Sequence, residues 1–250
     1  MSTINEELRK LYKRYISTMW DNQNYYPFLM QCPKEYEKAK IKIMFVGNDI
    51  KNFTKKDTKT DFTVDDAIEK NKKNEQNPVK QFASLLNEKV NEKNHNDYLV
   101  TELFMLGEYT GSLSDFDASE RWRNDNYSIL KKEVKICKPD CVVFLTQVPS
   151  MEDTFLLKGL LGSETVFMPT SDCSDVTLIQ YAQDIFGKQI LLIRVPKPQK
   201  TLSKKAVKIA EISSKLIKNR RHNNGYNTKI NLIEELSRTQ ESSNNNWQYR

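Results

Sequence analysis

The sequence predicts an α/β protein with a central, mostly parallel four-stranded sheet and helices on both faces, in a single domain. Two observations lead to this expectation. Four short apolar runs rich in β-branched residues recur along the chain, and segments with helical periodicity separate them. Strands that are apolar throughout are typical of parallel sheets covered on both faces, whereas half-exposed strands alternate apolar and polar residues.

The first half of the chain opens with a helix. Thr3 and Glu6 have the spacing of a capping box, and apolar residues follow at helical intervals, which predicts a first helix that ends near Trp20. In chain order we then expect an aromatic loop at 24–28, a buried strand over 41–47, a weak helical pattern over 64–68 within the polar stretch 51–77, and a helix over 79–90.

The second half continues the alternation of strands and helices. In chain order we expect a strand over 98–104, a helix over 127–136, a strand over 141–146, a short strand over 166–168, a helix over 176–186, a strand over 190–195 and a basic helix from 202 to about 220. Residues 1–220 therefore make up the expected α/β domain, and 221–250 form a polar, asparagine-rich tail with one short amphipathic patch at 230–236.

Composition excludes several classes of protein. The 250 residues are 38% hydrophobic and 10% aromatic, which fits a protein with a buried core. No apolar run approaches the ~20 residues that cross a bilayer, and the polar N-terminus does not resemble a secretory signal. Four cysteines and two histidines lack zinc-site spacing, and no glycine-rich phosphate loop is present. We therefore expect a cytoplasmic protein with reduced thiols and no metal, cofactor or membrane segment.

The positive charge is concentrated in one segment. The net charge is +6, and residues 200–221 hold eight Lys or Arg residues against one acidic residue, Glu211. This block accounts for the whole positive excess, which favours a polyanionic partner. A solvated helix face without a partner explains the same pattern equally well.

Polar residues gather at the ends of the predicted strands. Asn48 and Asp49 follow the first strand, Glu102 lies within the exit of the second, and Arg194 and Lys197 lie at the end of the last. Ligands of open parallel sheets bind beyond the carboxyl ends of the strands, so this edge is the expected site. Each residue also has an ordinary interpretation, as a turn or cap residue, on the solvated side of an edge strand, or as the partner of a surface carboxylate.

These residues resemble motifs of the uracil-DNA-glycosylase superfamily. Residues 43–53 are similar to its first motif, in which a hydrophobic strand runs into Gly-Gln-Asp/Glu and then an aromatic residue. Residues 100–104 resemble its second strand, which ends in a base-reading Asn, and 133–146 resemble its helix-Pro-Asp-strand unit. Residues 193–196 fall where the family has a His-Pro motif. The resemblance covers about residues 40–200, and it depends on the order of these short motifs.

The resemblance implies a DNA glycosylase with Asp49 as the catalytic carboxylate and with Asn48, in place of the usual Gln, as a second catalytic residue. A carboxylate near the sugar stabilises the oxocarbenium-like transition state and orients water. A flipped base needs an aromatic platform, which Phe53 or Phe62 would supply with Asn52 nearby, although either phenylalanine alone also fits a core position. DNA is the expected partner of a protein assumed to be monomeric. The expected backbone contacts are Lys200, Lys204, Lys205 and Lys208.

Two departures from the family pattern alter the expected substrate. Glu102 replaces the uracil-reading Asn, and an ionised carboxylate only accepts hydrogen bonds, so it suits an exocyclic amine such as that of cytosine. Val195 replaces the His that stabilises the departing base, a role that Arg194 or Lys197 could take. These changes predict excision of a non-uracil, modified base, for example in foreign DNA. The alternatives are an inactive nucleic-acid-binding module and a nucleoside hydrolase that uses Asp49 without DNA.

Overall fold

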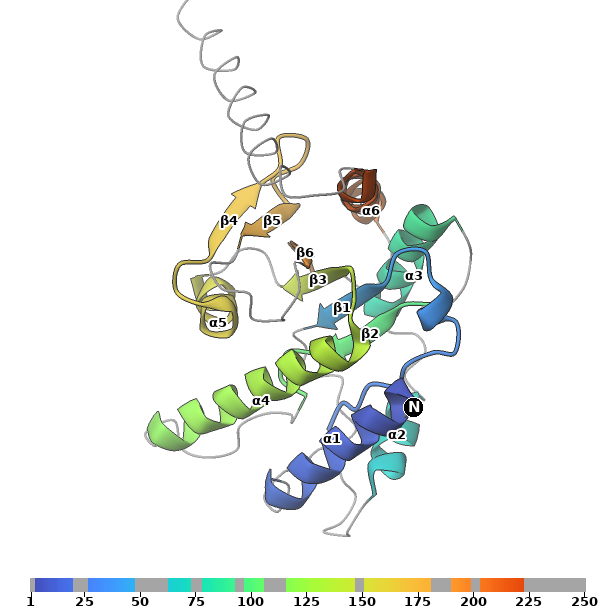
Figure 1. The fold of residues 1–250 in the computed structure, drawn as a ribbon. Coiled ribbons are helices and arrows are strands. Elements are labelled where there is room, and N and C mark those ends of the chain that lie inside the picture. The colour runs from blue at the N-terminus through green and yellow to red at the C-terminus, as the bar shows by residue number, and fades with distance from the viewer. Residues whose placement is uncertain are drawn as a thin grey trace, which may run out of the picture.

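The computed structural model describes residues 3–19, 27–47, 63–72, 78–92, 97–105, 116–146, 151–180, 190–198 and 203–222. The elements within these ranges are α1 (Ile4–Met19), the 3-10 helix η1 (Tyr36–Lys38), β1 (Ile43–Gly47), α2 (Val64–Lys72), α3 (Pro78–Asn91), β2 (Leu99–Glu102), α4 (Phe116–Cys137), β3 (Cys141–Thr146), α5 (Met151–Leu161), β4 (Val166–Pro169), β5 (Thr177–Gln180), β6 (Leu191–Pro196) and α6 (Lys204–His222). Figure 1 shows their arrangement.

Within the described residues, six strands form one mixed sheet in the order β2-β1-β3-β6-β5-β4. The strands β2, β1, β3 and β6 run parallel and match the four main strands that the sequence predicts, and β4 matches the short strand expected over 166–168. The strands β5 and β4 extend this parallel part through antiparallel pairing with β6 and with each other. The α/β class is confirmed, whereas the sheet is larger than the expected four strands and contains an antiparallel edge.

The helix expected over 176–186 is wrong where the structure describes it, because 177–180 form β5. Leu178 packs into the core on the side of α3 and α6, whereas Ile179 packs into the core on the side of α4 and α5. This alternation, together with backbone pairing to β4 and β6, overrides the local helical pattern. The structure also begins α4 at Phe116, eleven residues before the expected start at 127, and adds α5, which the sequence did not predict.

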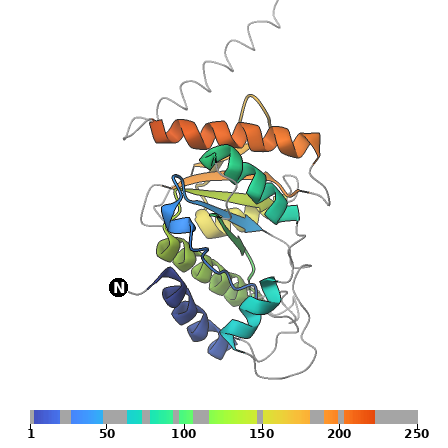
Figure 2. The same cartoon turned by 90° about the vertical axis from the view of Figure 1, so that its right-hand side faces the viewer.

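Helices cover both faces of the sheet, as expected. Met44 and Val46 of β1 belong to a core shared with α1, α2, α4 and α5, whereas Ile43 and Phe45 belong to a core shared with α3 and α6. Figure 2 shows the sheet between α6 and α3 on one side and α4 and α1 on the other. The side of α4 and the side of α6 are called here the α4 face and the α6 face. The central strands β1 and β3 bury side chains on both faces, which explains why their sequences are almost entirely apolar.

Side chains fix where these elements begin. The backbone N–H of Glu6 donates to Thr3 Oγ1 at 3.2 Å, and that of Thr3 donates to Glu6 Oε2 at 2.9 Å, so the predicted capping box of α1 is confirmed. Asn91 at the end of α3 accepts from the backbone N–H of Ile41 at 2.9 Å and donates to the Ile41 carbonyl at 3.0 Å. These two hydrogen bonds of the Asn91 side chain hold the backbone of Ile41 in place just before β1.

Candidate functional site

The strand order places a change of direction at β1. The chain passes from β1 to β2 on one side and then returns to β3 on the other side of β1. Loops that leave neighbouring strands at such a point diverge, and the crevice between them is where open α/β sheets bind ligands. Gly47 and Leu145 are paired across β1 and β3 near their carboxyl ends. The candidate site therefore begins at the residues that end these strands and β2.

Gly47 and Glu102 lie side by side at this edge. They are register partners in β1 and β2, and the backbone N–H of Leu103 donates to the Gly47 carbonyl at 2.8 Å. Glu102 is 2% exposed. A Cβ atom on Gly47 would collide with both carboxylate oxygens of Glu102. The glycine that ends β1 therefore leaves the space that a buried carboxylate occupies.

Glu102 points toward the α6 face. Val100, two residues earlier on β2, packs against the core of that face, and alternate residues of a strand share a face. Thr101, between them, points to the α4 face, where its hydroxyl donates to Glu133 at 2.9 Å. The interpretation of Glu102 as a solvent-facing residue of an edge strand is excluded, because its side chain is buried.

Several predicted site residues lie outside the described residues. These are Asn48, Asp49, Asn52, Phe53, Phe62 and Lys200. The chain leaves the sheet at Gly47, beside Glu102, and its next two residues are Asn48 and Asp49. The assigned roles of these six residues stay predictions.

The structure separates Arg194 from Glu102. Arg194 is 8% exposed on the α4 face, where its Nη1 donates to Thr154 Oγ1 of α5 at 3.2 Å and its guanidinium lies 4.9 Å from the ring centroid of Phe167. Val195, at the position of the family His, is 1% exposed in the core of the α6 face. Glu102 and Arg194 therefore occupy opposite faces of the sheet.

Lys197 lies at the edge where the parallel strands end. It follows β6, and its backbone N–H donates to the Thr146 carbonyl, the last residue of β3, at 2.5 Å. Its side chain is half-buried. Of the two cationic residues that the sequence proposes for the leaving group, Lys197 is the one that follows β6 and is bonded to the end of β3, the strand next to β1.

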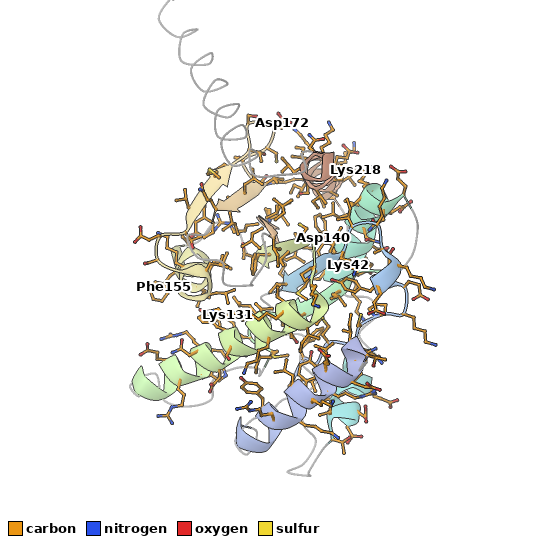
Figure 3. All side chains as sticks on the ribbon, in the orientation of Figure 1. Lys42, Lys131, Asp140, Phe155, Asp172 and Lys218 are labelled. Atoms are coloured by element: carbon orange, nitrogen blue, oxygen red, sulfur yellow. The ribbon has the colours of Figure 1, made fainter. Side chains whose placement is uncertain are left out.

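The basic helix α6 begins at the same edge. Lys205, in the first turn of α6, forms an ion pair with Asp175 at 2.9 Å. Asp175 lies just before β5, and Thr177 at the start of β5 pairs with Arg194 near the carboxyl end of β6. At the other end of α6, Lys218 pairs with Glu92 at 3.0 Å (Figure 3 labels Lys218). Ion pairs within the protein therefore offset part of the positive charge of residues 200–221.

Lys204 and Lys208 remain exposed near the start of α6. They are four residues apart and so share one side of the helix. Lys205 is exposed as well, but it also forms the ion pair with Asp175, whereas Lys204 and Lys208 form none of the described ion pairs. The predicted role in DNA binding stays a prediction for all three.

A buried polar group that the sequence did not predict lies on the α4 face. Glu133 is 0% exposed, and its carboxylate accepts hydrogen bonds from Tyr12 at 2.5 Å and from Thr101 at 2.9 Å. Burial raises the pKa of Glu133 to about 7, although both hydrogen bonds lower it. Helical spacing was the sequence signal that could have indicated the burial of Glu133. It lies four residues after Ile129 and four before Cys137, and both of these residues are buried in the same core.

The described residues contain no evident metal site or membrane span. No three His, Cys, Asp or Glu side chains among them gather closely enough to hold a metal ion. No helix in this part of the chain is long and apolar enough to cross a bilayer. None of the four cysteines forms a disulfide bond.

No protein-family model matches this sequence, and a search of curated proteins also finds no match. The resemblance to the uracil-DNA-glycosylase superfamily therefore depends on the short motifs and their order along the chain.

Proposed function

We propose that this protein is a DNA glycosylase that flips out and excises a base other than uracil. The observation that carries the proposal is the buried carboxylate of Glu102 beside Gly47, at the edge where β1 runs into Asn48 and Asp49. This carboxylate ends a strand at the edge where open α/β sheets bind their ligands, beside the point where the chain runs into Asn48 and Asp49.

The reaction requires two different carboxylate roles. Cleavage of the N-glycosidic bond builds positive charge on the sugar, which the Asp49 carboxylate stabilises while it orients the attacking water. Glu102 accepts a hydrogen bond from an exocyclic amine of the flipped base, which favours a cytosine-type base over uracil. Asn48 acts beside Asp49 as the second catalytic residue, Asn52 offers its amide to the base, and Phe53 or Phe62 stacks against the base.

The departing base carries negative charge, and we assign the stabilisation of this charge to Lys197. Its position after β6, tied to the end of β3, supports this choice over Arg194, whose guanidinium packs against Phe167 and Thr154 on the α4 face. A lysine ammonium supplies the positive charge that the family's His would otherwise provide.

The test is incubation with DNA substrates that each carry one candidate base, followed by alkali treatment and detection of strand breaks at abasic sites. The substrates carry uracil, cytosine, or cytosine with a modified ring position. We expect breaks with an amine-bearing base and a loss of at least about a hundredfold in Asp49→Asn. The matched control is Asp172→Asn, an exposed carboxylate in the loop before β5, which should retain the wild-type rate.

A second variant tests the reading of the base. Glu102→Gln keeps the side-chain volume beside Gly47 but replaces an acceptor by an amide that also donates. We expect it to lower release of the amine-bearing base and to raise relative release of uracil. Unchanged base preference in Glu102→Gln, or wild-type release by Asp49→Asn, would contradict these roles. DNA binding without release of any base would favour the inactive nucleic-acid-binding module, and release from free nucleosides alone would favour the nucleoside hydrolase.

A further inference from the structure

A second basic surface lies on the α4 face, between α4 and α5. Side chains of α4 and one residue of α5 enclose a pocket of about 380 Å³. Its lining consists of Asn124, Tyr127, Ser128, Lys131, Lys132, Lys135 and Gly159. Figure 3 shows Lys131 on the side of α4 toward α5, with Phe155 on α5 beyond it. Three ammonium-bearing side chains thus share one small pocket whose lining contains no acidic residue.

The pocket is built by close contact between two helices. The hydroxyl of Tyr127 donates to the Leu156 carbonyl at 3.0 Å, which ties α4 to α5. Gly159 lies against the same tyrosine, and a Cβ atom there would come within 3.2 Å of the Tyr127 ring. Gly159 therefore allows α5 to approach the Tyr127 ring, and the lysines of α4 line the pocket beside this contact.

The positive charges of this pocket are close to one another. Lys131 is half-buried, and burial together with the neighbouring charge of Lys135 lowers its pKa. Lys132 donates to the Tyr15 hydroxyl at 2.5 Å, and the same hydroxyl lies 3.2 Å from Ser128 Oγ. None of the ion pairs that the described residues form with one another includes these three lysines. An anion in the pocket would offset this like-charge repulsion.

We propose that this pocket binds the phosphate group of a small molecule, such as pyrophosphate or a mononucleotide-sized phosphate ester. Lys131 and Lys135 supply charge-assisted hydrogen bonds, and the Ser128 hydroxyl and Asn124 amide add neutral donors. The volume falls within the range of small-molecule sites, roughly 300–1,000 Å³, and the concave shape suits a compact anion better than an extended strand.

The phosphate site is separate from Glu102, because the pocket lies on the α4 face whereas the Glu102 side chain points toward the α6 face, and it does not depend on the proposed glycosylase activity. Cys137 ends α4 and leads within four residues to Cys141, the first residue of β3. Lys135 is two residues, or about 3 Å, before the end of α4, so it lies toward the amino ends of the strands. Glu102 ends β2 at the opposite edge.

Calorimetric titration of the full chain with pyrophosphate, at constant ionic strength, tests this proposal. We expect saturable binding at one site, and we expect Lys131→Gln/Lys135→Gln to weaken it at least about tenfold because two charged contacts are lost. The matched control is Lys10→Gln/Lys13→Gln, which removes two exposed lysines of α1 and should leave affinity within about twofold. A parallel titration uses a short single-stranded oligonucleotide.

The melting temperature separates loss of a ligand site from loss of the fold. Removal of two neighbouring like charges should leave the melting temperature of Lys131→Gln/Lys135→Gln unchanged or higher. Pyrophosphate should raise the melting temperature of the wild-type protein and of the control but not of the pocket variant. Equal affinity in the pocket variant and the control, absence of pyrophosphate binding, or binding of the oligonucleotide alone would each overturn the proposal.

Discussion

Replacement of Glu133 by glutamine should change how the stability of this protein depends on pH. The side chain is fully buried between α1, α4 and β2, with its two oxygens held by Tyr12 and Thr101. Burial raises its pKa from the ordinary 4.5 to about 7. Burial, and then the charge of Glu133, also raise the pKa of Tyr12, so the tyrosine stays a hydrogen-bond donor to the carboxyl group. The folded protein therefore holds Glu133 protonated below about pH 7.

Proton linkage determines whether the free energy of unfolding rises or falls with pH. A raised pKa means that the folded chain binds this proton more tightly than the unfolded chain does. The stabilisation is complete below the unfolded pKa of 4.5 and is lost as the pH rises through about 7. The rise of the Glu133 pKa from 4.5 to about 7 contributes on the order of 3 kcal/mol to the free energy of unfolding, at roughly 1.4 kcal/mol per pKa unit. Glutamine keeps the shape and the acceptor for Tyr12 but does not titrate.

Urea unfolding of the wild type and of Glu133→Gln between about pH 5 and 8 measures this difference. We expect the free energy of unfolding of the variant, relative to the wild type, to rise by on the order of 3 kcal/mol over this range. Glu120→Gln, an exposed carboxylate on the same helix, is the control and should leave the pH profile close to that of the wild type. Parallel pH profiles for Glu133→Gln and the wild type would refute the assignment of a raised pKa.

The parallel part of the sheet was predictable because its strands carry their own signal. In β1 and β3, burial on both faces selects a run of apolar residues, and the expected strand over 141–146 coincides with β3. The strand β5 has no such signal, because its conformation depends on pairing with β6, its neighbour in the sheet but not in the sequence. The helix α5 was missed because the apolar residues near its end, including Leu160 and Leu161, do not form a clear amphipathic stripe.

The candidate site was predictable only as separate strand ends. The sequence pattern placed Gly47 at the end of one strand and Glu102 near the end of another, but the parallel register that makes them neighbours joins residues far apart in the chain. The same limit applies to the α4–α5 pocket. The lysines of α4 fit a solvated helix face when taken alone, and the pocket becomes visible only when Gly159 of α5 is placed against Tyr127 in the structure.

Two further predictions concern the carboxyl edge. Gly47→Ala should lower the free energy of unfolding by about 1–3 kcal/mol through collision with the Glu102 carboxylate, and by distinctly less in a Glu102→Ala background; equal losses in both backgrounds, measured by urea unfolding, would exclude this collision. Lys204→Gln/Lys208→Gln tests the basic helix, because each phosphate contact releases counterions and steepens the dependence of DNA affinity on salt. These two lysines are exposed at the start of α6, near the edge that carries Glu102, whereas Lys205 already faces Asp175. The double variant should therefore reduce the slope of log affinity against log salt by roughly two for every DNA sequence, without altering which base is released. A salt slope equal to that of the wild type, determined by fluorescence anisotropy at several salt concentrations, would mean that this side of α6 is a solvated surface.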